Sequence, residues 1–209
     1  MIIMGPQGSG KGTIGLMIAE KYNIPIISTG DLFRNAMAKG TDLGVKAKEY
    51  VNKGIIVPDE ITNPVLLERL QENDCKEGFI LDGYPRKMAQ AEFLEKNMVK
   101  IDVVIYLNAS KDIIMESLSN RLTCKKCGAI YNTKHVPPKK PGVCDKCSGE
   151  LYQREDETPA AVKQRLELYE KETKPVIVYY KKKGILREVD ASLRVPKIIF
   201  DRVMRALKD

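Results

Sequence analysis

The sequence contains no tryptophan, a single histidine and only 6% aromatic residues among its 209 positions. Proteins that bind single-stranded nucleic acid stack bases on exposed aromatic rings, so this low content argues against an extended base-stacking surface. There is no apolar run of about eighteen residues, which argues against a membrane-spanning helix. No basic segment followed by a long apolar one opens the sequence, so a secretory signal is not expected. We expect a cytoplasmic protein with no nucleic-acid partner and no membrane partner.

The composition favours a globular fold that binds anions. Hydrophobic residues make up 43% of the chain, which is ordinary for a soluble protein of one or two domains. The net charge is +7, from 35 basic and 28 acidic residues. A positive balance of this kind favours polyanionic partners, which include nucleotides.

Five short apolar segments with little alternation predict strands that are covered on both faces. They lie at Met1–Met4, Pro25–Ser28, Phe79–Asp82, Val103–Leu107 and Leu186–Val189. Helices are expected from Lys11 and at Asp59–Glu72, Ala89–Asn97, Lys111–Arg121, Thr158–Lys182 and Pro196–Leu207. Strands that alternate with helices indicate an α/β fold with a doubly wound, five-stranded parallel sheet.

Two segments interrupt this alternation. Thr29–Val57 carries helix after helix with no strand, which predicts a helical insert. Leu122–Glu157 is rich in proline, glycine, lysine and cysteine, which predicts a small inserted module.

The segment GPQGSGKGT at Gly5–Thr13 joins the first strand to the first helix and contains the G-x-x-x-x-G-K pattern of a phosphate-binding loop. Successive backbone N–H groups of such a loop turn toward one anion at the positive end of the helix. The residues concerned are Gly8, Ser9, Gly10, Lys11, Gly12 and Thr13. Gly12 stands where Ser or Thr usually ligates magnesium, and a hydroxyl follows only at Thr13.

Charged residues follow several of the predicted strands. Asp82 ends an apolar strand, a place where carboxylates commonly hold magnesium directly or through water. LYQREDE contributes Arg154 and Asp156. We expect five arginines to converge on one edge of the sheet, where phosphoryl transfer needs positive charge, namely Arg34, Arg86, Arg121, Arg154 and Arg165.

Four of the five cysteines form two C-x-x-C pairs, Cys124/Cys127 and Cys144/Cys147, sixteen residues apart. This spacing predicts a tetrahedral thiolate site suited to zinc, structural because no ligand position is left open. Two disulfides are the alternative, which a cytosolic setting disfavours. His135 is interpreted as an ordinary surface residue, and Cys75 as a small buried hydrophobic residue.

Taken together, GPQGSGKGT, STGDLFR, LDGYPRKMAQA, LYQREDE and the paired cysteines resemble the adenylate kinases, in the bacterial long-lid form with a four-cysteine metal site. The resemblance covers essentially the whole chain. It implies a monomeric P-loop NTPase that reversibly transfers a phosphoryl group from MgATP to AMP, giving two ADP. It also implies a core of residues 1–27, 58–120 and 158–209, an AMP-binding insert of residues 28–57, and a zinc-bearing lid of residues 121–157.

The resemblance also assigns roles to individual residues. It implies that ATP is bound by residues 8–13 together with Arg121, Ile130, Tyr131 and the backbone of Leu193. It implies AMP contacts at Thr29, Arg34, Ile55, Ile56, Val57, Gly83, Tyr84, Pro85, Arg86, Gln90, Arg154 and Arg165. The implied catalytic set is Lys11, Asp82, Arg86, Arg121, Arg154, Asp156 and Arg165.

The resemblance accounts for Gly12 in the phosphate-binding loop. In these enzymes magnesium is held largely by phosphate oxygens and water, and the acid at Asp82 acts on it through water. One departure stands out. Many relatives carry an arginine against the adenine at the position of Ser117. Its absence predicts weaker stacking of ATP, unless Leu122 and Tyr131 compensate.

Two other functions fit parts of the pattern. Another nucleoside monophosphate kinase, acting on CMP, UMP or GMP, would share the loop and the arginines; Thr29 and Gln90 favour AMP by resemblance. A zinc-ribbon ATPase that binds nucleic acid would explain the basic charge and the paired cysteines. The scarcity of aromatic residues argues against that reading.

Overall fold

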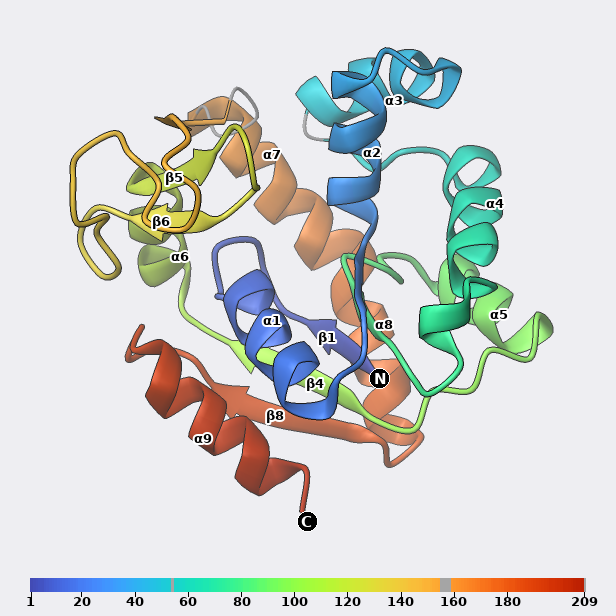
Figure 1. The fold of residues 1–209 in the computed structure, drawn as a ribbon. Helices are drawn as coiled ribbons and strands as arrows, with labels where there is room; N and C mark the ends of the chain where they lie inside the picture. The colour runs from blue at the N-terminus through green and yellow to red at the C-terminus, as the bar shows by residue number, and fades with distance from the viewer. Residues whose placement is uncertain (54, 155–158, 209) are drawn as a thin grey trace.

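Five parallel strands form the central sheet of the computed structural model, which describes residues 1–53, 55–154 and 159–208 (Figure 1). Their order is β2-β3-β1-β4-β8. The strands are β1 (Ile2–Met4), β2 (Ile26–Ser28), β3 (Ile80–Asp82), β4 (Val104–Asn108) and β8 (Leu186–Asp190). The predicted α/β class and all five predicted strands are therefore confirmed. Since β1 lies between β3 and β4, the loop that follows β1 starts at the middle of the sheet.

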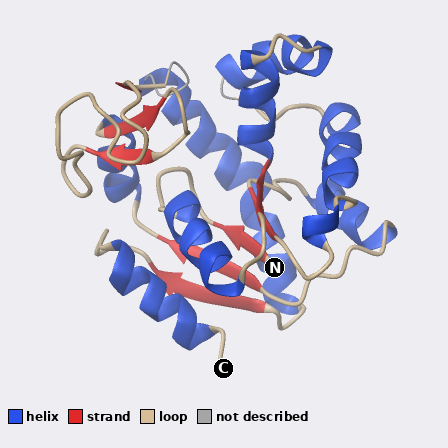
Figure 2. Cartoon of the chain, viewed as in Figure 1, coloured by secondary structure: helices blue, strands red, loops and turns tan. Residues whose placement is uncertain are grey.

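Helices cover both faces of this sheet (Figure 2). Ile3, Ile80 and Ile105 point to the face packed by α1 (Lys11–Tyr22) and α9 (Pro196–Ala206). The alternate residues Ile2, Leu81 and Val104 point to the other face. There they meet α4 (Asp59–Leu70), α5 (Met88–Lys96) and α8 (Lys174–Lys182). Burial on both faces explains why the strands read as continuous apolar runs.

The predicted helical insert consists of α2 (Thr29–Ala38) and α3 (Asp42–Asn52). The side chain of Ser28 accepts a hydrogen bond from the Asp31 N–H at 3.3 Å, and Thr41 caps α3 in the same way. Phe33, Ala47 and Val57 form a small core that belongs to the insert.

The predicted cysteine module is a second, antiparallel sheet of order β6-β5-β7. Its strands are β5 (Arg121–Cys124), β6 (Ile130–Asn132) and β7 (Leu151–Tyr152). The predicted helix Lys111–Arg121 is two residues too long, because α6 (Lys111–Ser119) ends at Asn120 and Arg121 already pairs with Asn132. Figure 1 shows this module and the α2–α3 insert as two separate lobes beside the core.

The predicted helix Thr158–Lys182 is interrupted. Thr158 lies outside the described residues, and α7 (Pro159–Leu168) is joined to α8 by a π-helical turn at Tyr169–Thr173. In this turn the Thr173 hydroxyl donates to the Arg86 carbonyl at 3.0 Å. Such turns often mark functional positions in long helices. Within the described part of the chain, no helix has both the length and the apolar character needed to cross a membrane.

Candidate active site

A cavity lies at the end of β1, between the core and the two inserts. The phosphate-binding loop forms its floor, α2 and the β3–α5 turn form one side, and β5, β6 and α7 contribute the other side. All five arginines predicted to converge line this cavity, together with Lys11 and Asp82. The sequence thus correctly predicted the convergence of charge, although the residues come from segments far apart in the chain.

The loop after β1 adopts a conformation that only glycine adopts readily. Gly5, Gly8 and Gly10 have φ angles of 146°, 81° and 96°. A Cβ atom at Gly5 would lie 2.6 Å from the Leu107 carbonyl oxygen, so a side chain there would force the loop away from β4. Gly10 caps α1 without any side-chain hydrogen bond, which leaves the first amides of the helix directed at the cavity.

Two further groups of the loop fit a bound phosphate. The Ser9 hydroxyl is fully buried and has no hydrogen-bond partner among the described residues. The Lys11 ammonium group donates to the carbonyls of Gly5 and Pro6, at 2.8 and 2.9 Å. Loss of hydration in the cavity lowers the pKa of Lys11 to about 8, with Asp82 opposing this shift and Arg86 and Arg121 adding to it. A polyanion would add negative charge to that of Asp82 and so favour the charged form of the lysine.

Asp82 ends β3 at the bottom of the cavity. Burial raises the pKa of this carboxyl group, and the charges of Lys11 and Arg86 act against the shift. A carboxylate oxygen is the type of donor that magnesium prefers, so Asp82 fits a role beside a magnesium–phosphate complex.

Hydrogen bonds of Gln90, Thr29 and Arg86 hold the turn that follows β3. Gln90 is buried, and its amide oxygen accepts from the Arg86 N–H while its amide nitrogen donates to Asp59, both at 2.7 Å. The Thr29 hydroxyl and Arg86 Nε both donate to the Gly83 carbonyl, at 3.1 and 2.8 Å. Gln90 and Thr29 therefore fix the turn that presents Arg86 to the cavity.

The predicted AMP positions divide into two groups. The cavity lining includes Arg34, Ile56, Gly83, Tyr84, Pro85, Arg86, Arg154 and Arg165. It does not include Thr29, Ile55, Val57 or Gln90. The Tyr84 side chain is buried in the core and its hydroxyl donates to Asn63 at 2.7 Å. The Val57 carbonyl accepts from the Thr62 hydroxyl at 3.2 Å.

An acid that the sequence did not single out lies among these arginines. Asp31, from the STGDLFR segment, pairs with Arg34 at 2.6 Å. Burial acts to raise the pKa of Asp31, but the ion pair with Arg34 lowers it, and the charge of Arg154 adds to the lowering. Arg154 also donates to the Thr123 hydroxyl at 2.9 Å, which links the β5 strand to this group of charges.

The remaining predicted positions are split between the cysteine module and the chain after β8. Ile130 and Tyr131 of β6 line the cavity, and Ile130 Cδ1 would lie 3.4 Å from a Cβ atom on Gly12. His135 is exposed, as expected, and also lies at the rim of the cavity. Leu193 is 53% exposed and is not part of the lining, whereas the adjacent Arg194 is. Asp156 lies outside the described residues.

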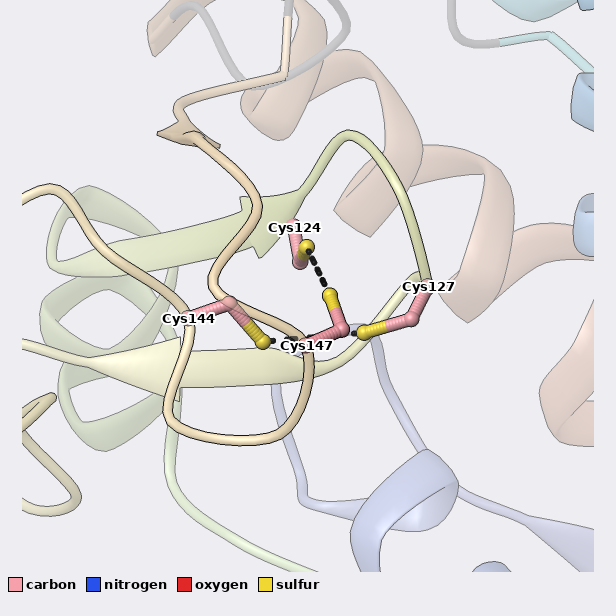
Figure 3. A group of neighbouring side chains, drawn as sticks. All are labelled: Cys124, Cys127, Cys144 and Cys147. Atoms are coloured by element: carbon pink, nitrogen blue, oxygen red, sulfur yellow. Dashed lines mark hydrogen bonds between the residues drawn. The ribbon is translucent and has the colours of Figure 1, made fainter.

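The four cysteines of the module point toward one another, Cys124 from the end of β5, Cys127 from the β5–β6 loop, and Cys144 and Cys147 from the β6–β7 loop (Figure 3). Their sulfur atoms all lie within 4.8 Å of one another, with 3.5 Å between Cys124 and Cys147 and 3.6 Å between Cys127 and Cys144. A tetrahedron with Zn–S bonds of about 2.3 Å has sulfur–sulfur edges of about 3.8 Å. Disulfides require about 2.05 Å, and all five cysteines are unpaired thiols. The geometry therefore fits the predicted zinc site and not the alternative of two disulfides.

Tyr131 joins this cluster to β6. Its hydroxyl oxygen accepts from the Asp145 N–H at 2.8 Å, so its proton can be donated to Cys144 Sγ, 3.5 Å away. This hydrogen bond is the main cause that lowers the pKa of Cys144 to about 6. The side chain of Tyr131 therefore contacts the cysteine cluster, and Tyr131 also lines the cavity.

We predict that phosphate binding depends on pH through Lys11. Below its pKa of about 8 the lysine is already charged, so the affinity for inorganic tripolyphosphate should be nearly constant. Above about pH 8 binding must take up a proton, so the Kd should rise by up to about tenfold per pH unit. Calorimetric titrations between pH 7 and 9.5 measure this slope. An equal slope in Lys11→Met would assign the effect to another group.

We also predict that Cys144→Ser loses bound zinc. Because the module has little hydrophobic core, loss of the metal should lower the melting temperature by about 5 °C or more while leaving some activity. Elemental analysis and thermal denaturation measure the two effects. Cys75→Ser, outside the cluster, is the control and should keep the metal. Wild-type zinc content in Cys144→Ser would refute the four-thiolate site.

Comparison with known proteins agrees with this geometry. The family model described as adenylate kinase matches residues 3–185. An adenylate kinase of Archaeoglobus fulgidus is 50% identical over 92% of this chain and 90% of its own length. One from Geobacillus sp. (strain WCH70) is 49% identical over 96% and 95%, and one from Caldanaerobacter subterraneus subsp. tengcongensis is 46% identical over 99% and 95%. With its phosphate-binding loop, convergent arginines and cysteine-bearing module, this chain belongs to the adenylate kinase family.

Proposed function

We propose that this protein catalyses reversible phosphoryl transfer from MgATP to AMP, giving two ADP, and so balances the adenine nucleotides of the cell. The observation that carries the proposal is the cavity in which the phosphate-binding loop faces arginines from both inserts. Two anionic nucleotides meeting end to end require positive charge along one path, and this cavity supplies it.

ATP occupies the side of the cavity next to the loop. The amides of residues 8–13 and the Lys11 ammonium group hold its phosphates, and Ser9 supplies a further donor. Arg121 and the β6 strand cover the bound nucleotide, and the loop at Leu193 closes the end that receives the base.

AMP occupies the side formed by α2 and the β3–α5 turn. Arg34 and Arg86 bind its phosphate, and Thr29 and Gln90 hold the Arg86 turn in place. Ile56, the residue of the segment 55–57 that lines the cavity, contacts the base. Arg154 and Arg165 reach the phosphates of both nucleotides and align donor and acceptor.

The transfer needs positioning and charge more than acid–base chemistry. The acceptor is an AMP phosphate oxygen, already anionic, which attacks without giving up a proton to the protein. Charge on the transferring group is spread over its equatorial oxygens, where Lys11 and the arginines stabilise it. When bound with ATP, magnesium would neutralise phosphate charge, with Asp82 positioned to hold its water ligands. Closure of the cysteine module would exclude water and prevent hydrolysis.

We further infer three parts with distinct roles: a core of residues 1–27, 58–120 and 158–209, an AMP-binding part of residues 28–57, and a lid of residues 121–157 held by zinc. We expect a monomer, as the family resemblance implies. We place the protein in the cytoplasm and expect no nucleic-acid partner.

A comparison of acceptors tests the function. With MgATP as donor, AMP should give a kcat/KM well above those of CMP, UMP and GMP. A compound that joins two adenosines through five phosphates should bind one to one and inhibit competitively against both substrates. AMP no better than the other monophosphates would refute the assignment, as would binding of a single nucleotide only.

Replacing Lys11 with methionine should lower kcat by about 100- to 1000-fold, because the charge that meets the transferring phosphoryl group is lost. The fold should persist, since burial disfavours the charged form of this lysine, as its lowered pKa shows. Lys21→Met, at the exposed end of the same helix, is the matched control and should retain full activity. Equal kcat values for Lys11→Met and Lys21→Met would show that Lys11 has no role in the reaction.

A further inference from the structure

Arg194 lies in the loop between β8 and α9, and its side chain enters the cavity beside the phosphate-binding loop. The loop is firmly anchored. The Ala191 N–H donates to the Asn108 carbonyl at 2.8 Å, and Arg202 of α9 donates to the carbonyl and the carboxylate of Asp190, both at 2.7 Å. Arg194 itself has a φ angle of 56°, which non-glycine residues rarely adopt. The fold therefore holds this side chain in a defined place.

The guanidinium group is only partly satisfied. Its Nη2 donates to the Ser117 hydroxyl of α6, while Nε and Nη1 are buried without a hydrogen-bond partner in the described part of the chain. Nη1 is 4.0 Å from the position of a Cβ atom on Gly10. Buried donors without acceptors are costly, so a purely structural arginine would be expected to use them.

The neighbouring acid, Glu116, does not accept hydrogen bonds from Nε or Nη1 of Arg194. Glu116 is the charge that acts on Arg194, but its carboxylate is paired with Lys134 at 2.7 Å on the surface. The charges that act on Lys11 are those of Asp82, Arg86 and Arg121. Arg194 is not among these charges.

We propose that Arg194 contacts the base of the donor nucleotide, with its guanidinium plane held in place by Ser117. Apolar side chains line the same cavity close by in the sequence, at Pro196 and Ile199 of α9, and Ile130 and Val136 enter from the cysteine module. A planar cation beside apolar surface suits an aromatic base, which it can stack against or hydrogen-bond through its remaining donors. The inference rests on the proposed function only in taking ATP as the donor.

Calorimetric titration with ATP and with inorganic tripolyphosphate separates contact with the base from contact with phosphate. Arg194→Met keeps the stem of the side chain and removes the guanidinium group. It should raise the Kd for ATP about tenfold and change the Kd for tripolyphosphate less than about twofold. Arg194→Lys keeps the charge but not the plane, so its affinity for ATP should also be reduced. Arg205→Ala, exposed on α9, is the control and should change neither Kd.

Equal weakening of ATP and tripolyphosphate in Arg194→Met would make Arg194 a phosphate ligand and overturn the proposal. Unchanged ATP affinity would also overturn it. Thermal denaturation checks the fold of each variant, and Ser117→Ala tests the same contact by removing only the hydroxyl that holds the guanidinium group, with a smaller rise in the Kd for ATP expected. Failure of the wild type to phosphorylate AMP would refute the proposed function, whereas these titrations would still decide the role of Arg194.

Discussion

The concentration of positive charge in one partly dehydrated cavity is the constraint on which the site depends. The pKa of Lys11 shows the effect of this environment most directly, because loss of hydration and the nearby arginines lower it to about 8. Its hydrogen bonds to the carbonyls of Gly5 and Pro6 hold it at the mouth of the loop. The sheet, the two inserts and the buried Gln90 all serve to keep these cations close together despite their repulsion. A polyphosphate chain relieves that repulsion, so binding and catalysis draw on the same charges.

Strand β6 connects the cysteine cluster to the cavity. Successive side chains of a strand point to opposite faces, so Ile130 of β6 faces the phosphate-binding loop while Tyr131 faces Cys144. Metal bound by the four thiolates would therefore stiffen the strand that faces the phosphate-binding loop. This arrangement explains how a closed, non-catalytic metal site can contribute to a reaction that takes place elsewhere in the molecule.

Ser117 and Arg194 lie far apart in the sequence, but their side chains are hydrogen-bonded in the structure. The family resemblance leads one to expect an arginine on α6, and Ser117 stands there instead. In the structure a guanidinium group nevertheless lies beside Ser117, carried by the loop after β8, and Ser117 accepts its hydrogen bond. No local motif marks Arg194, because its placement depends on the packing of α9 against β8 and on the anchoring of Asp190.

By itself the sequence determined the features that depend on local geometry and short spacing. Continuous apolar runs predicted the five strands, the glycine pattern predicted the phosphate-binding loop, and the two C-x-x-C pairs predicted the thiolate cluster. Only the tertiary structure decided which side chains face the cavity. In the structure Gln90 and Tyr84 form hydrogen bonds with other residues of the protein, and Tyr131 contacts the cysteines. Asp31 and Arg194, which the sequence did not single out, line the cavity. The physical reason is that side-chain direction follows from long-range packing, about which residue type and spacing carry little information.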